Sequence, residues 1–173
     1  MTDSLRGARP PSRGYTGVSR ETNTKALVVF DSVYGNTRLA AEEIARGLAQ
    51  SGNVAVTIAN VEKLDPEKAR EFPIVVIGAP NHLGTASKTM RDFLPLLGNG
   101  TLLRKRVALF DTCYADQTGV AVRKMEEILR EKEPNLHFSL SGLSVVVESS
   151  RGPVRQGDLL KCRQFGMRLA APS

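Results

Sequence analysis

The sequence predicts a three-layer α/β fold in which helices cover both faces of a parallel five-stranded sheet. Short apolar runs alternate with segments of helical period from Lys25 onward. This alternation is the pattern of parallel strands joined by crossover helices. Because such crossovers are right-handed, few topologies remain, and we expect a doubly wound sheet with the strand order 2-1-3-4-5.

Each element of this fold is marked by its own apolar pattern. Strands are expected at residues 26–30, 54–59, 74–78, 107–111 and 143–147. The segment 61–72 is the least periodic, and we expect a short helix there that begins near Pro66. Four longer helices are predicted by apolar residues at helical spacing: Ala40, Ile44 and Leu48; Met90, Phe93, Leu94 and Leu97; Ala121, Met125, Ile128 and Leu129; and Leu159, Cys162, Phe165 and Leu169.

The chain divides into a tail and one domain. Residues 1–24 are rich in Gly, Pro, Ser, Thr and Arg, and Pro10-Pro11 forbids a continuous helix, so we expect a disordered tail there. Residues 25–173 are expected to form a single domain with one core. No apolar run approaches the roughly 20 residues of a membrane span, and the N-terminus lacks the apolar stretch of a secretory signal. We therefore predict a cytoplasmic protein that does not enter a membrane.

Charge and cysteine usage argue against several classes of site. The formal net charge is +6, but four of the 24 basic residues lie in the expected tail, and the sequence contains no Trp. A surface that tracks nucleic acid usually carries basic residues along one face with aromatic residues between them, so we do not expect nucleic-acid binding. Cys113 and Cys162 are far apart, and His82 and His137 stand alone, so the sequence predicts neither a redox dithiol nor a metal site.

The loop after the first strand has the features of a phosphate-binding turn. It reads Asp31-Ser32-Val33-Tyr34-Gly35-Asn36-Thr37 and leads directly into the first helix. A turn at a helix start presents unpaired N–H groups at the positive end of the helix dipole, an environment that a phosphate dianion prefers. Two hydroxyl groups and a glycine add donors and allow close approach. The alternative is an ordinary turn capped by Asn36 or Thr37, which leaves Tyr34 at its crest unexplained.

At this loop the sequence resembles the flavodoxin family. The family's phosphate loop has a hydroxyl residue, a spacer, a second hydroxyl residue, then Gly, a spacer and Thr. Ser32, Gly35 and Thr37 fit this pattern, while Tyr34 places a phenol at the second hydroxyl position. The Tyr-Gly-Asn-Thr form resembles the flavodoxin modules of flavodiiron proteins, and the resemblance extends over nearly all of residues 25–170. It implies an FMN site that includes Ser32, Val33, Tyr34, Gly35, Asn36 and Thr37.

The resemblance implies a second loop that lines one face of the flavin ring. The residues concerned follow the third strand, and they are Pro80, Asn81, His82, Leu83 and Gly84. A peptide next to Gly84 can rotate at little steric cost, so that its carbonyl could accept a hydrogen bond from the reduced ring. His82 stands where many relatives place a bulky aromatic residue. Stacking, proton donation and a solvent-facing position all remain open for it.

The third implied loop follows the fourth strand. Its expected cofactor contacts are Thr112, Cys113, Tyr114, Asp116 and Gly119, with Tyr114 stacked on the outer face of the ring. This loop has fewer glycines than many relatives have. We expect Cys113 to be a small loop residue rather than a reactive thiol, because no activating base is evident. Asp111 and Asp116 are our candidates for a carboxylate near N1 of the ring, where its charge would lower the reduction potential.

These features predict an FMN-binding electron-transfer protein that passes electrons between redox partner proteins as a monomer or weak homodimer. The basic balance indicates an acidic partner. An FMN-dependent NAD(P)H or quinone oxidoreductase of the same fold is one alternative, and a cofactor-free interaction module is another. We do not expect a phosphoacceptor receiver domain, because the third strand ends in Gly78-Ala79-Pro80 where such a domain has an aspartate.

Overall fold

The structure, a computed structural model, describes residues 23–172, and its centre is a parallel β-sheet. Five strands lie in the order β2-β1-β3-β5-β6, and the two-residue strand β4 pairs antiparallel with the end of β3. The predicted fold class and the predicted order of the five strands are therefore confirmed. Residues 1–22 of the tail predicted for residues 1–24 lie outside the described residues, and Thr24 is the first residue of β1.

The elements follow one another in the alternation that the sequence predicts. The strands are β1 (Thr24–Phe30), β2 (Val54–Asn60), β3 (Ile74–His82), β4 (Thr85–Ala86), β5 (Arg106–Cys113) and β6 (Leu143–Val146). The α-helices are α1 (Asn36–Ala49), α2 (Lys88–Phe93), α3 (Val120–Lys132) and α4 (Asp158–Ala170). Short 3-10 helices are η1 (Val61–Lys63), η2 (Pro66–Glu71), η3 (Leu94–Leu97) and η4 (Ala115–Gln117).

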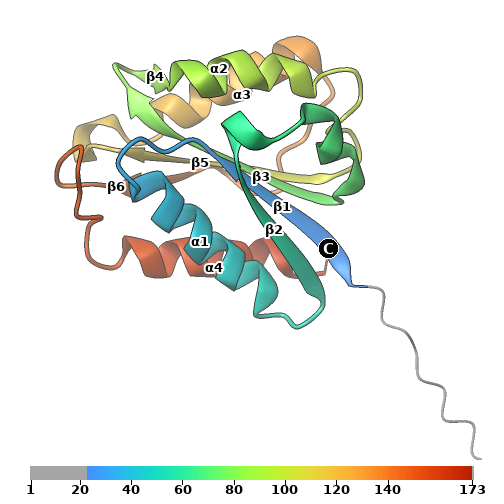
Figure 1. Cartoon of the computed structure of the whole chain (residues 1–173), viewed down its shortest axis with the longest axis horizontal. Helices are drawn as coiled ribbons and strands as arrows, with labels where there is room; N and C mark the ends of the chain where they lie inside the picture. The colour runs from blue at the N-terminus through green and yellow to red at the C-terminus, as the bar shows by residue number, and fades with distance from the viewer. Residues whose placement is uncertain (1–22, 173) are drawn as a thin grey trace, which may run out of the picture.

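Two helical layers bury the two faces of the sheet. Figure 1 shows α1 and α4 side by side on one face and α2 and α3 on the other. Side chains from alternate positions of β1 divide between the two cores: Ala26 and Val28 pack with α1 and α4, whereas Leu27 and Val29 pack with α2 and α3. The inner strands β1, β3 and β5 are buried on both faces for this reason, and their short apolar runs in the sequence were sufficient to locate them.

The connections after β1 and β3 depart to opposite faces of the sheet. The connection after β1 enters α1 in one layer, and the connection after β3 enters α2 in the other. Adjacent loops that diverge in this way open a crevice at the carboxyl ends of the strands, which is where open α/β sheets bind ligands. The register places Phe30 of β1 beside Gly78 of β3 at this edge.

Two strands run further than the sequence predicts. We expected β3 to end at Gly78 and β5 at Asp111, but both continue because Ala79 still pairs with Asp111 and Pro80 with Thr112. The end of β3 then folds back on β4 as a hairpin. The expected short helix near Pro66 is present as η2, a 3-10 helix capped by Asp65.

Helices α1 and α4 approach each other at backbone distance. A Cβ atom added to Gly47 would lie 2.0 Å from the Arg163 carbonyl oxygen, and one added to Gly166 would lie 2.1 Å from the Ile44 carbonyl oxygen. Both contacts are far below van der Waals separation, and backbone atoms cannot rotate aside. The absence of side chains at these two positions therefore sets how closely α4 holds α1.

The Gly166→Ala substitution tests this packing. We expect it to lower the free energy of unfolding by about 2–3 kcal/mol, because the two helices must separate to admit the methyl group. Chemical denaturation measures the change. Gln164→Ala, at an exposed position of the same helix, is the control and should change the free energy by less than about 0.5 kcal/mol. Equal effects of the two substitutions would contradict the close approach of the helices.

Candidate functional site

A small cleft opens at the carboxyl edge of the sheet, between the loops that follow β1, β3, β5 and β6. Its enclosed part measures about 120 Å³, which suits a phosphate-sized group and is smaller than the pocket of a whole cofactor. A larger ligand would therefore extend over the rim. The residues that line the cleft are Ser32, Val33, Tyr34, Asn36, Thr37, Pro80, Asn81, His82, Thr112, Cys113, Tyr114, Val147 and Ser150.

The turn between β1 and α1 lines this cleft and contains free N–H groups. Gly35 caps α1 with a left-handed backbone (φ 93°), a conformation that favours glycine. Ser32 Oγ accepts hydrogen bonds from the N–H groups of Gly35 (3.1 Å) and Arg38 (3.3 Å). Among residues 23–172, no atom accepts a hydrogen bond from the N–H groups of Asn36 and Thr37. These two donors are left for a ligand at the positive end of the helix dipole.

A pair of hydroxyl groups joins this turn to the end of β5. Thr37 Oγ1 lies 2.8 Å from Thr112 Oγ1, and both residues are buried. Each hydroxyl can donate one hydrogen bond and accept others, so the pair can offer one further donor to an anion in the cleft. The pair also ties the first turn of α1 to the inner strand β5.

The segment after β6 closes the cleft, and the sequence analysis did not find its contribution. Val147 and Ser150 line the cleft, although we predicted no contacts from this segment. Asn36 Nδ2 donates to the Ser150 carbonyl oxygen at 2.9 Å, and the Arg151 guanidinium lies 5.7 Å from the centroid of the Tyr34 ring. The sequence feature closest to this segment is the glycine-proline turn at Gly152-Pro153. Such a turn indicates a bend in the chain but does not indicate which residues the bend contacts.

A buried donor without a partner lies on the opposite wall. Asn81 Oδ1 accepts a hydrogen bond from the Gly84 N–H at 3.0 Å, while Asn81 Nδ2 is buried and has no partner among the described residues. Leaving a buried amide donor unpaired costs about 1–3 kcal/mol, so such groups usually face a ligand or water. Asn81 lines the same cleft as Asn36 and Thr37, so an unpaired side-chain donor and two unpaired N–H groups belong to residues of one cleft.

The hairpin turn carries two predicted site residues away from the cleft wall. The pairing of His82 with Thr85 places Leu83 and Gly84 at the tip of the hairpin, and the Leu83 side chain is fully exposed. His82 and Pro80 remain on the cleft wall. Contacts of Leu83 and Gly84 with a ligand therefore stay predictions, and they would require a ligand that reaches beyond the cleft.

The end of β5 supplies a buried thiol, and the loop that follows it supplies a half-exposed aromatic ring. Tyr114 is 46% exposed at the cleft rim, where its ring is available for stacking. Burial, together with the charge of Asp111, raises the pKa of Cys113 to about 12, so the thiol is protonated and unreactive at neutral pH. Asp116 lies in the exposed turn η4, and Gly119 caps α3. Neither of these two lines the cleft.

Comparison with known proteins places this geometry in a family. A family model described as Flavodoxin domain matches residues 27–143, which include the first three loops of the cleft. The chain belongs to the flavodoxin domain family. The predicted resemblance is therefore confirmed, and the matched residues include the loop at Ser32–Thr37.

Solved structures share the fold of this flavodoxin domain. Flavodoxin 2 from Bacillus cereus superposes with a TM-score of 0.72 at 25% identity, covering 85% of this chain and 98% of its own. Flavodoxin 1 of the same organism superposes with a TM-score of 0.69 at 24% identity, and the match covers 84% of this chain and 97% of the flavodoxin. The Flv1 flavodiiron core from Synechocystis sp. PCC6803 superposes with a TM-score of 0.65 at 22% identity, and the match covers 86% of this chain and 36% of the flavodiiron chain. The flavodoxin domain thus spans about a third of the flavodiiron chains it matches and nearly all of the flavodoxins.

The structure corrects the role that we predicted for Asp111. We expected its carboxylate near the ring of a bound flavin, but the side chain is buried and faces the start of α3, where Oδ2 accepts a hydrogen bond from the Val122 N–H at 3.1 Å. Asp111 Oδ1 is buried without a partner among the described residues. Burial raises the pKa of Asp111, although the hydrogen bond from the Val122 N–H opposes the shift. The carboxyl group belongs to the packing of α3 and not to the cleft wall.

The raised pKa of Asp111 predicts a pH dependence of stability. The folded carboxyl group keeps its proton above its usual pKa of 3.8, so ionisation destabilises the fold as the pH rises from about 4 towards the raised value. Asp111→Asn removes this titration and keeps an acceptor for Val122. The variant should therefore gain stability relative to the parent as the pH rises above 3.8, as measured by denaturant unfolding over a range that starts at about pH 4. A difference in unfolding free energy that does not change over this range would contradict the assignment.

Proposed function

We propose that this flavodoxin domain binds one FMN and transfers electrons between redox partner proteins. The observation that carries the proposal is the pair of free N–H groups at the start of α1, which belong to Asn36 and Thr37, two residues that line the cleft. A phosphomonoester in the cleft would satisfy both donors and interact favourably with the helix dipole. No basic side chain is required for this interaction.

The rim of the cleft has side chains that could contact the flavin ring of FMN. Its rim combines apolar and aromatic side chains that suit a flat ring: Val33, Tyr34, Pro80, His82, Tyr114 and Val147. Asn81 lines the cleft, and its amide Nδ2 has no partner among the described residues. A ring carbonyl or ring nitrogen is a suitable acceptor for such an amide donor. The donor set therefore fits FMN, with the phosphate in the enclosed part and the ring at the rim.

When bound, FMN supplies the redox chemistry, and the residues of the chain hold it and set its surroundings. The Ser32 hydroxyl keeps the first loop in shape through its two internal hydrogen bonds. The bond between Asn36 and Ser150 holds the segment after β6 against that loop. A partly enclosed phosphate and a ring at the surface would leave one edge of the ring accessible to a partner protein.

A comparison of two flavins tests the proposal. We expect the protein without cofactor to quench FMN fluorescence at one equivalent and to bind riboflavin at least about a hundredfold more weakly. Two charge-assisted hydrogen bonds contribute about 3 kcal/mol together, and riboflavin lacks the phosphate that makes them. Fluorescence titration measures both affinities. Equal affinity for the two flavins, or no binding of either, would contradict the proposal.

A substitution in the hydroxyl pair tests the phosphate end separately. Thr37→Val removes one hydroxyl group and leaves Thr112 without its partner, so FMN affinity should fall about tenfold while riboflavin affinity stays the same. Thr57→Val, at an exposed position of the edge strand β2, is the matched control. Circular dichroism of each variant checks the fold. A loss of FMN affinity that is equal in both variants would argue against a phosphate contact at Thr37.

A further inference from the structure

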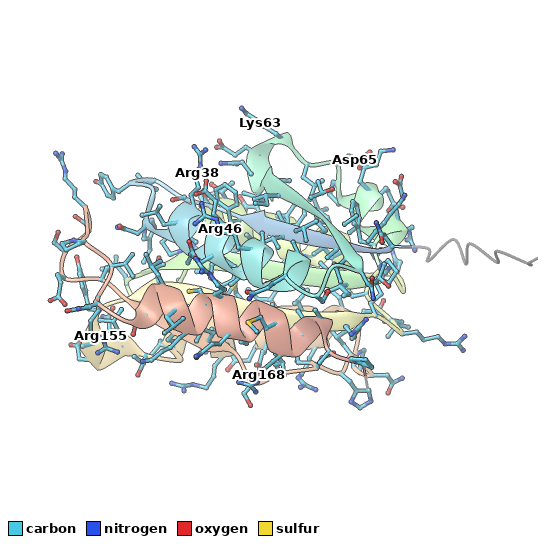
Figure 2. All side chains as sticks on the ribbon, turned by 90° about the horizontal axis from the view of Figure 1, so that it is seen from below. Arg38, Arg46, Lys63, Asp65, Arg155 and Arg168 are labelled. Carbon is cyan, nitrogen blue, oxygen red and sulfur yellow. The ribbon has the colours of Figure 1, made fainter. Side chains whose placement is uncertain are left out.

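The layer of α1 and α4 carries an excess of positive charge, and we call its outer surface the basic face. Figure 2 looks onto this layer, with Arg38 and Arg46 along α1 and with Arg155 and Arg168 along the α4 side. The only carboxylates in α1, α4 and the segment between β6 and α4 are Glu42, Glu43, Glu148 and Asp158. The cations in the same segments are Arg38, Arg46, Arg151, Arg155, Lys161, Arg163 and Arg168.

One buried carboxylate of this layer joins its two helices. Glu43 of α1 accepts hydrogen bonds from Arg163 of α4, whose Nη2 and Nε lie 2.7 and 2.9 Å from Glu43 Oε2. Arg46 of α1 donates to Glu43 Oε1. The carboxylate is 11% exposed, whereas the two arginine side chains are 44% and 63% exposed. The cluster therefore presents its positive groups to solvent and keeps its negative group beneath them.

A second buried carboxylate repeats the arrangement at the start of α4. Asp158 Oδ2 accepts the Val146 N–H at 2.8 Å, and Asp158 Oδ1 accepts Lys161 Nζ at 3.1 Å and Arg155 Nη2 at 3.3 Å. The aspartate side chain is 2% exposed, and its two cations are about half exposed. Each cluster thus has one more positive than negative charge, and the surplus lies on the surface.

On the opposite layer, the ion pairs have no surplus of positive charge, because each pair contains one cation and one carboxylate. There Lys68 pairs with Glu71, Lys88 with Asp92 and Lys124 with Glu127, and both members of each pair are more than half exposed. Charges that pair at the surface cancel towards an approaching partner. The two helical layers therefore differ in the electrostatic potential that they present, although both contain many charged residues.

The cations of the basic face are also held in place before any partner arrives. The buried carboxylates restrain Arg46, Arg163, Arg155 and Lys161, and the glycine contacts described above lock α1 against α4. Ordering long side chains costs conformational entropy when a complex forms, and a restrained side chain has already lost that freedom. The face is therefore better suited to binding than a set of free surface cations.

Apolar side chains between the cations favour a protein as the partner. Leu39, Leu160 and Met167 are 47%, 58% and 44% exposed on this layer, and protein interfaces combine such apolar contacts with a charged rim. They lie singly, so they do not form the continuous apolar face that a membrane-bound helix needs. Among the described residues of this face and its border with the cleft, Tyr34 is the only exposed aromatic residue. The face therefore has no series of rings on which nucleic-acid bases could stack.

We propose that the basic face docks an acidic protein surface. The face borders the cleft, because Tyr34, Asn36 and Arg151 line the groove that leads from the cleft to Leu39 and Leu159. A protein bound there would lie beside the cleft mouth. That this partner is a redox protein rests on the proposed function, whereas the docking itself does not require a bound flavin.

Two double variants, each of which removes two positive charges, test the docking. Arg46→Gln with Arg168→Gln removes two cations from the basic face, and Lys88→Gln with Lys124→Gln removes two from the opposite layer. Poly-L-glutamate serves as the acidic polypeptide, and its affinity for the full chain is measured by titration calorimetry at low salt. We expect about a fivefold loss of affinity for the first double variant and less than about a twofold loss for the second. Amide resonances that move on binding should belong to α1 and α4.

Several results would overturn the docking. These are equal losses in the two double variants, no binding at all, or resonance shifts confined to α2 and α3. Tighter binding of duplex DNA or phosphatidylserine vesicles than of poly-L-glutamate at equal charge would also overturn it. The titration is made without flavin, so its failure leaves the FMN proposal standing, and a failure to bind FMN leaves this result unaffected.

Discussion

The arrangement of the site depends on two unpaired N–H groups at the start of α1. Helix geometry leaves the first N–H groups of any helix without internal partners, but this chain controls which of them remain free. Ser32 satisfies those of Gly35 and Arg38, and those of Asn36 and Thr37 stay open to the cleft. The left-handed Gly35 makes the sharp entry into the helix possible. The rest of the fold holds this short turn in position.

Packing and charge act together to hold α1. Gly47 and Gly166 let α1 and α4 meet at backbone distance, and Glu43 joins the two helices through Arg163. At the other side, the Thr37–Thr112 hydroxyl pair ties the first turn of α1 to β5. Because the same buried carboxylates leave their cations on the surface, the interactions that position the candidate phosphate loop also create the basic face.

The sequence predicted the local features well and the long-range features poorly. Strands and helices followed from apolar spacing, and the loop at Ser32–Thr37 followed from hydroxyl and glycine spacing, because such patterns depend on neighbouring residues. The extension of β3 past Gly78 depends on pairing with a strand some 30 residues away, which spacing does not encode. Asp111 was misplaced because its side chain turns to α3, and the contribution of Ser150 depends on its contact with Asn36.

The central claim is that backbone N–H groups at Asn36 and Thr37 hold a terminal phosphate. Amide resonances of a ¹⁵N-labelled protein, followed while FMN is added, test it most directly. The account predicts that the amide protons of these two residues move strongly downfield with FMN and little with riboflavin, as new hydrogen bonds to a charged acceptor form. Unchanged resonances at both positions in the FMN-saturated protein would contradict it.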